Sequence, residues 1–107
     1  MKICICCSLA FTDEAKRIAE ELKDMGHEVF LPNGVLLDVI HRPDYDPVVA
    51  KTGNGYDAIR DHFDKIKKAD AVLVLNFTKN NVDNYIGANT FLEMGFAYYV
   101  GKPIYAI

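Results

Sequence analysis

The sequence lacks the marks of several large protein classes. Lys and Arg total 12 against 15 Asp and Glu, which leaves a net charge of -3. Because nucleic-acid binders carry a basic surface, we predict no nucleic-acid partner. No apolar run approaches the roughly 20 residues that span a bilayer, so we also predict no membrane partner. Apolar residues 3–11 could imitate a secretion signal, but no small-residue cleavage site follows them, and we expect a buried strand there instead.

Cysteine is scarce and confined to one short segment. The chain has three cysteines, Cys4, Cys6 and Cys7. An odd number in one predicted strand cannot form a disulfide framework, which favours a reducing, cytoplasmic location. No His or acidic residue lies beside them at metal-ligand spacing, so we predict core packing and no metal site. The alternation of side chains along a strand places Cys7 on the opposite face from Cys4 and Cys6. Cys7 also falls near the end of the strand, where a ligand could reach it.

Several well-known catalytic and phosphate-binding motifs are also missing. The chain has neither G-x-x-x-x-G-K-[ST] nor G-x-G-x-x-G, which excludes the two common phosphate cradles. A tyrosine-phosphatase loop needs an Arg six residues after its Cys, and Asp13 stands at that distance from Cys7. A receiver domain needs an Asp at the end of its third strand, where this chain has Asn76.

The sequence does contain an alternation of strand and helix patterns. Half of the 107 residues are apolar, enough to form the core of one domain over residues 1–107. Thr12 fits a helix N-cap, and the long connection 32–55 is typical of a functional loop. Strands and helices alternate over the predicted ranges 2–7, 12–25, 27–31, 56–68, 71–75, 90–100 and 103–107.

This order predicts an α/β fold with a parallel sheet. Right-handed crossovers give a three-layer, doubly wound, flavodoxin-like arrangement of about four strands in the order 2-1-3-4. Ligands of such folds bind at the carboxyl ends of the strands, where the winding reverses. We therefore expect a crevice between the first and third strands, lined by residues 7–11, residues 76–78 and the start of the third long helix. An uncovered sheet edge beyond the fourth strand favours a homodimer or higher homo-oligomer.

Glu93 is the most conspicuous candidate for a functional residue. It is the only charged residue between Asp83 and Lys102, and a helix this apolar is largely buried. A buried carboxylate must be hydrogen-bonded, protonated or reserved for a ligand. The spacing from Thr90 to Glu93 also matches a capping box, in which Glu93 would bond the Thr90 amide. The local sequence leaves both interpretations open.

Other polar residues fall near the expected crevice. His62 shares the apolar face of its helix with Ile59 and Ile66, which fits either a core residue or a general acid or base. Ser8 follows the first strand and could bind phosphate or sugar hydroxyls, and Asn76 could contact a polar ligand. Asn89 belongs to a group of asparagines that loops also favour.

Three segments carry a resemblance to a known family. They are residues 2–8, residues 66–76 and residues 87–97, the last followed by Gly101, Lys102 and Pro103. The third is the most specific, because Glu93 is followed by a Gly, a hydrophobic residue and an Ala. The chain resembles the nucleoside 2-deoxyribosyltransferase-like superfamily, which includes deoxynucleotide N-hydrolases.

The resemblance implies a site and a chemistry. Glu93 would be the nucleophile that attacks C1′ of a deoxyribose, with no metal or cofactor. His62 would be the acid or base, although the family has an Asp there, and Cys4 and Cys7 replace a family Tyr and Gly. A small nucleoside or nucleotide would be the partner. The implied substrate-binding residues are Cys7, Ser8, Asn76, Gly87, Asn89 and Thr90.

Three hypotheses therefore follow from the sequence. The first is an enzyme that hydrolyses an N-glycosidic bond or transfers a deoxyribosyl group. The second is a non-catalytic nucleotide-binding module that kept the pocket and lost the proton donor. The third is a structural domain in which Glu93 is only a helix cap. Placement of His62 and Glu93 in one open crevice would favour the first two.

Overall fold

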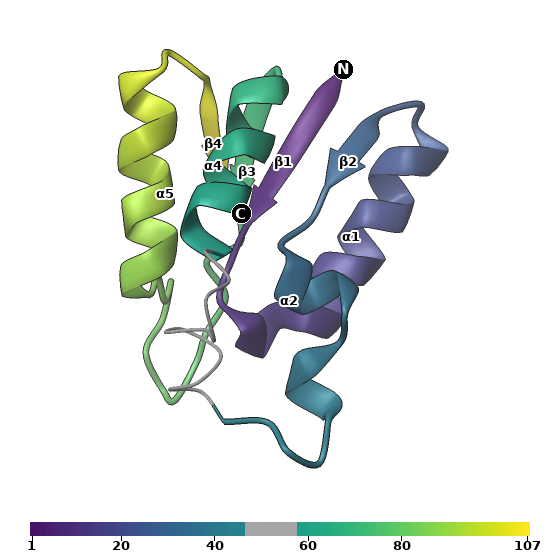
Figure 1. The fold of residues 1–107 in the computed structure, drawn as a ribbon, viewed down its shortest axis with the longest axis vertical. Coiled ribbons are helices and arrows are strands. Elements are labelled where there is room, and N and C mark those ends of the chain that lie inside the picture. The colour runs from purple at the N-terminus through teal and green to yellow at the C-terminus, as the bar shows by residue number, and fades with distance from the viewer. Residues whose placement is uncertain (47–57) are drawn as a thin grey trace.

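The computed structural model describes residues 1–46 and 58–107. Residues 47–55 of the predicted functional loop and residues 56–57 at the predicted helix start lie outside the described residues. The strands are β1 (Lys2–Cys6), β2 (Glu28–Phe30), β3 (Ala71–Val74) and β4 (Ile104–Ala106). The α-helices are α1 (Thr12–Asp24), α2 (Asn33–Leu36), α4 (Ala58–Lys68) and α5 (Ala88–Tyr99), and two 3-10 turns are η1 (Leu9–Phe11) and η2 (Val39–His41) (Figure 1).

The described strands form one parallel sheet. Its order is β2-β1-β3-β4, and Cys4 of β1 lies opposite Phe30 of β2 and Val72 of β3. The helix α1 packs with β2, while α4 and α5 lie side by side against β1 (Figure 1). The predicted α/β fold with strand order 2-1-3-4 is confirmed, and the winding reverses between β1 and β3.

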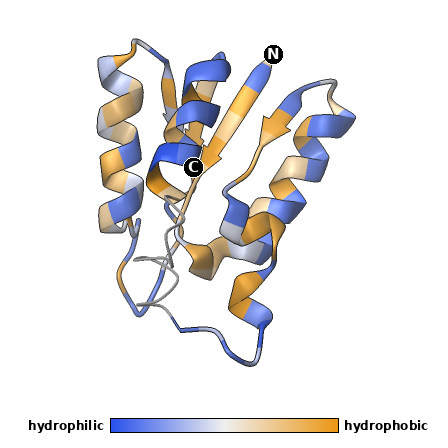
Figure 2. Ribbon diagram, in the orientation of Figure 1, coloured by the Kyte–Doolittle hydropathy of each residue, from blue (hydrophilic) through white to orange (hydrophobic). Residues whose placement is uncertain are grey.

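Two cores form on the two faces of the sheet because successive side chains of a strand point to opposite sides. Ile5 and Cys7 belong to the core that α1 covers. Cys4 and Cys6 belong to the core that α4 and α5 cover, together with Ile66. Figure 2 shows the apolar residues concentrated along the central strands. The three cysteines are buried and free, with Cys7 on the opposite face from the other two, as the alternation predicts.

The entry to α1 differs from the prediction. The N-cap position is Phe11 and Thr12 is the first helical residue. The Thr12 hydroxyl instead donates to the Leu9 carbonyl oxygen at 2.6 Å, because the chain first makes the turn η1. Ser8 caps that turn, since its Oγ accepts from the Ala10 N–H at 3.3 Å. The N-cap prediction for Thr12 is wrong, and the capping residue lies four positions earlier.

The start of α5 decides between the two interpretations of Glu93. The helix begins at Ala88, with Gly87 at the N-cap position and no side-chain cap. Thr90 is therefore already helical, and Glu93 lies in the second turn. The capping-box interpretation is wrong, and with it the hypothesis that Glu93 serves only as a helix cap.

An aromatic contact joins the helices α4 and α5. The rings of Phe63 on α4 and Phe96 on α5 stack with centroids 4.2 Å apart and an interplanar angle of 4°. This pair sets the distance between the two helices that carry His62 and Glu93. Within the described residues, no helix has the length and apolar character needed to cross a membrane.

Candidate functional site

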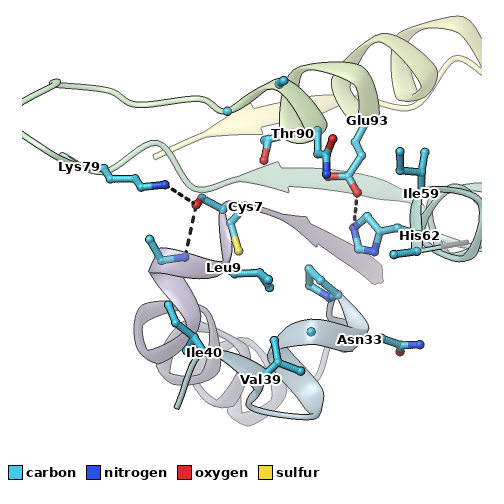
Figure 3. Close-up of a pocket in the computed structure, with 18 of the residues that line it drawn as sticks. Cys7, Leu9, Asn33, Val39, Ile40, Ile59, His62, Lys79, Thr90 and Glu93 are labelled. Carbon is cyan, nitrogen blue, oxygen red and sulfur yellow. Dashed lines mark hydrogen bonds and ion pairs between the residues drawn. The ribbon is translucent and has the colours of Figure 1, made fainter. Parts of the chain in front are cut away.

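A cavity of about 470 Å³ opens where β1, β2 and β3 end (Figure 3), a size typical of small-molecule sites. Segments that follow each of these strands contribute to its wall, as do the first turns of α4 and α5. This is the reversal point of the winding, where the fold predicts a ligand. Its lining includes Cys7, Ser8, Asn33, Ile59, His62, Lys79, Tyr85, Gly87, Asn89, Thr90 and Glu93.

The cavity brings together most of the residues that the sequence singled out. Cys7, Ser8, His62, Gly87, Asn89, Thr90 and Glu93 all line it. Asn76 is not among the described lining residues; its side-chain amide donates to Asn84 Oδ1 at 3.4 Å. The loop after β3 instead reaches the cavity through Lys79 and Tyr85. The roles of all these residues stay predictions at this point.

Sequence reasoning missed Lys79, Asn33 and Ile59 as lining residues. Lys79 lay in a polar loop with no motif around it. A signal was present in the adjacent Asn80 and Asn81, because paired asparagines are typical of a tight turn that fixes the residue before it. Asn33 enters the cavity through α2, a short helix inside the connection that the sequence predicted as a loop.

Glu93 and His62 form a buried pair at one end of the cavity (Figure 3). Glu93 Oε2 lies 3.7 Å from His62 Nε2, and their side chains are only 11% and 3% exposed. Burial raises the pKa of Glu93 to about 7, although the neighbouring His62 charge opposes the change. The carboxylate thus titrates near neutral pH, unlike an exposed glutamate. Perturbed carboxyl groups of this kind are typical of functional sites.

The surroundings of His62 fix the protonation of one of its ring nitrogens. Nε2 lies 3.0 Å from the Ile5 carbonyl oxygen, which can only accept, so Nε2 carries a hydrogen. Cys4 Sγ and Cys6 Sγ each lie 3.4 Å from the same nitrogen. Nδ1 is therefore the nitrogen that gains or releases a proton. It is buried, with no hydrogen-bond partner among the described residues.

Charges around His62 favour its protonated form. Burial alone lowers the pKa of His62, but the hydrogen bond with Cys4 and the charge of Glu93 outweigh it and leave the pKa above its ordinary value. The pKa of Cys4 falls to about 6, chiefly through the hydrogen bond from Cys6, and His62 contributes to the same change. The pKa of Cys6 is raised well above its ordinary value because its thiol donates that bond and is buried.

The same three residues form a cluster that could in principle hold a metal ion. Ligand atoms of Cys4, Cys6 and His62 lie within 4.8 Å of one another. This cluster was not predicted, because His62 is remote from the two cysteines along the chain. However, the hydrogen bond to the Ile5 carbonyl engages the Nε2 lone-pair direction that a metal would need. The arrangement is that of a hydrogen-bonded cluster that fixes the imidazole.

Cys7 presents a neutral thiol to the cavity. Burial and the nearby Glu93 charge raise its pKa to about 12. A nucleophilic cysteine requires the thiolate, so Cys7 contributes surface to the cavity and no nucleophile.

Comparisons with known proteins support the fold. No protein-family model and no curated protein sequence matches the chain. Among solved structures, a 2-deoxyribosyltransferase of Bacillus psychrosaccharolyticus is similar at 22% identity with a TM-score of 0.60, covering 99% of this chain and 71% of that one. The flavoenzyme FerB of Paracoccus denitrificans, an NAD(P)H:(acceptor) oxidoreductase, is similar at 15% identity with a TM-score of 0.54, covering 99% of this chain and 59% of that one. Two proteins with different chemistry share this fold with the chain, so the function must be argued from the site itself.

Proposed function

We propose that this protein cleaves the N-glycosidic bond of a deoxynucleoside or deoxynucleotide, as a hydrolase or a deoxyribosyltransferase, with Glu93 as the nucleophile. The observation that carries the proposal is the buried Glu93 carboxyl group, held 3.7 Å from His62 at the wall of a cavity. The likeness of the fold to a 2-deoxyribosyltransferase and the motif around Glu93 agree with it. A deoxyribose suits a carboxylate nucleophile, because the missing 2′-hydroxyl makes an oxocarbenium-like transition state easier to reach.

The first half-reaction forms a covalent intermediate. The Glu93 carboxylate attacks C1′ of the deoxyribose, and the bond from C1′ to the base nitrogen breaks. Its electron pair remains on the base, which takes a proton from the His62 imidazolium. The products of this step are the free base, a neutral His62 and a deoxyribosyl ester of Glu93.

The second half-reaction restores the enzyme. Water, or the nitrogen of a second base, attacks C1′ and displaces the Glu93 carboxylate. The proton released by the attacking group returns to His62. The step therefore balances in charge and protons whether the acceptor is water or a base, and Cys4 and Cys6 hold the imidazole throughout.

The direct test is base release from a panel of deoxynucleosides and deoxynucleotides. We expect Glu93→Gln, which keeps the side-chain shape but cannot attack C1′, to reduce release by 10³-fold or more, on the order of the loss seen when a nucleophile is removed. The matched control is Glu28→Gln, an exposed glutamate on β2, which should leave release unchanged. Equal release by wild type and Glu93→Gln would sink the assignment of the nucleophile.

A non-catalytic nucleotide-binding module is the second candidate. It is favoured by one observation: burial keeps much of the Glu93 carboxyl protonated at neutral pH, which suits a hydrogen-bond donor to a ligand better than a nucleophile. The same panel separates the two functions. If deoxynucleotides raise the melting temperature but no base is released, the protein binds without cleaving.

We also propose a cytoplasmic location and a homo-oligomeric assembly. Three buried free thiols support a reducing compartment. The assembly rests on apolar surface exposed by α5.

A further inference from the structure

One ring nitrogen of His62 is shared by three groups that can carry a negative charge. Its Nε2 lies 3.4 Å from Cys4 Sγ, 3.4 Å from Cys6 Sγ and 3.7 Å from Glu93 Oε2. The two sulfur atoms belong to β1 and the carboxyl group to α5, so His62 on α4 connects two other elements. A single imidazolium therefore faces two thiols and one carboxyl group.

This cluster is closed to solvent. Cys4 and Cys6 are 0% exposed, His62 is 2% exposed and Glu93 is 8% exposed. A buried charge without a partner is costly. One negative group balances the positive charge of His62, and a second would remain unpaired in the protein interior. The favoured charge state of the cluster therefore has a single anion beside the imidazolium.

Lys65 is a second cation near the cluster, but an acidic partner compensates its charge. It lies three residues after His62 on α4, and its charge acts on both His62 and Cys4. Its Nζ is 3.3 Å from Asp61 and donates to the Leu31 carbonyl oxygen at 2.8 Å. Lys65 thus faces Asp61 and the end of β2, and it does not take the place of His62 as the counter-ion of a second anion.

The neighbouring strands bring apolar side chains to Cys4. Its partners across the sheet are Phe30 on β2 and Val72 on β3. Cys7 belongs to the core on the other face of the sheet, and its pKa of about 12 keeps it neutral. The charged or ionisable groups that face Cys4 are therefore those of β1, α4 and α5 already named.

Two members of the cluster remain as candidates for the single anion. Cys6 keeps its proton, because its buried thiol donates a hydrogen bond to Cys4. Cys4 accepts that bond and contacts the imidazole, and both interactions stabilise its thiolate. Glu93 is the other candidate, and the charge of Cys4 raises its pKa together with burial. The negative charge therefore belongs either to Cys4 or to Glu93.

We propose that Cys4 is a positioning residue that acts through His62: its thiolate competes with the Glu93 carboxylate for the one imidazolium, and so sets the pH range in which Glu93 is a free nucleophile. Its effect on base release rests on the proposed function, whereas the competition itself does not. While Cys4 carries the negative charge, Glu93 keeps its proton and cannot attack C1′. Transfer of that proton to the Cys4 sulfur, or its loss to solvent at higher pH, gives the carboxylate.

The first test is the pH profile of kcat/KM for base release, which reports the ionisation of the acid and the base of the free enzyme. Cys4→Ser keeps a small side chain but removes the anion. We expect both limbs of the profile to move to lower pH, the ascending limb by about one pH unit. Glu93 then ionises without a competitor, and His62 loses an anionic partner. If Cys4 only packs against the imidazole, release should fall at every pH with both limbs in place, and that result would overturn the proposal.

Three further variants separate charge from packing. Val72→Ala removes apolar volume opposite Cys4 in the same core and should lower stability without moving the limbs. Cys6→Ser keeps an O–H that can donate to Cys4 and should stay close to the wild-type profile. Cys6→Ala removes that donor and should move the limbs in the direction of Cys4→Ser by a smaller amount, which keeps the test open if Cys4→Ser does not fold. Equal shifts in Val72→Ala and Cys4→Ser, or equal profiles in the two Cys6 variants, would contradict the proposal.

A second measurement needs no turnover. Ultraviolet absorbance distinguishes a thiolate from a thiol, and we expect wild type to show a thiolate that forms with a pKa of about 6. It should be absent from Cys4→Ser and retained in Cys7→Ser. The infrared band of a protonated carboxyl group, assigned by its loss in Glu93→Gln, should titrate with a pKa of about 7 in wild type and about one unit lower in Cys4→Ser.

These titrations keep the inference distinct from the proposed function. If no substrate releases its base, the proposed function fails, while the thiolate and carboxyl signals still decide whether Cys4 and Glu93 compete. A wild-type protein without a thiolate at neutral pH would refute the role of Cys4. The same would follow from a Glu93 carboxyl group that titrates at one pH in both wild type and Cys4→Ser.

Discussion

At the scale of single residues, the site contains one carboxyl group, that of Glu93, whose burial lowers the stability of the folded protein at neutral pH. The ordinary pKa of a glutamate is 4.5, and in the folded protein that of Glu93 is about 7. Between these two pH values the unfolded chain has released this proton while the folded protein still holds it. Stability from this residue is therefore highest at low pH and falls as the pH rises from about 4.5 to about 7.

This reasoning predicts how Glu93→Gln changes stability. The amide does not titrate, so the variant should gain free energy of unfolding relative to wild type as the pH rises, by up to about 3 kcal/mol between pH 5 and pH 8. Urea unfolding of both proteins across this range measures the difference. The exposed control Glu28→Gln should stay parallel to wild type. A gap between Glu93→Gln and wild type that does not change with pH would show that the pKa of Glu93 is not raised.

The sequence revealed Glu93 more readily than its partner. A single charge in a long apolar segment is visible without any structure, because burial of a carboxylate is costly and needs a reason. His62 had no such signal, since a histidine on an apolar helix face fits a core position equally well. Its contact with Glu93 depends on how α4 and α5 pack across β1, and side-chain spacing within one helix contains no information on that packing.

At the scale of elements, the pairing of α4 with α5 sets the geometry of the site. His62 precedes Phe63 in α4, and Glu93 lies three residues before Phe96 in α5, so the ring stack of Phe63 and Phe96 lies next to the pair of His62 and Glu93 along both helices. The predicted fold fixed which helices share a face of the sheet, because right-handed crossovers leave no other choice. It could not fix the rotation of each helix, which side-chain packing decides.

We predict that Phe96→Ala lowers stability by about 2 kcal/mol, through lost apolar burial and lost ring contact. Base release should also fall, because His62 and Glu93 are no longer held at one separation. Tyr98→Ala removes an aromatic ring from the same helix at a position that is 82% exposed and should change stability by less than about 0.5 kcal/mol. Thermal unfolding compares the two. Equal losses in both variants would mean that the stack does not hold the helices together.

The loops show where sequence reasoning was least informative. Continuous apolar runs identified the strands β1 and β3 to within one residue, but the connection after β2 contains the helix α2, which has only four residues and no periodic signal. Lys79 was overlooked for a related reason. Its place in the cavity follows from the turn at Asn80 and Asn81, and a turn determines where a side chain points only once the strands around it are positioned.

At the scale of the whole molecule, the surface of α5 that faces away from the sheet is unusually apolar. Phe91, Leu92, Tyr98 and Tyr99 are 70%, 49%, 82% and 86% exposed. Phe91 and Tyr98 are seven residues apart, as are Leu92 and Tyr99, so each pair lies on one side of the helix. The neighbouring strand β4 pairs only with β3 among the described strands. An apolar helix face beside an open sheet edge favours association with a second copy of the chain.

We therefore predict a homodimer, or a higher homo-oligomer, that buries this face of α5. Light scattering after size exclusion should show a mass above that of one chain, and the double variant Phe91→Lys with Tyr98→Lys should shift it toward the monomer, because burying two ammonium groups against apolar side chains is unfavourable. The control Met25→Lys places the same charge at another exposed apolar position, just after α1, and should leave the assembly intact. A wild-type protein that stays monomeric over a wide range of concentrations would contradict the prediction. The exposed rings of α5 would then need a different partner.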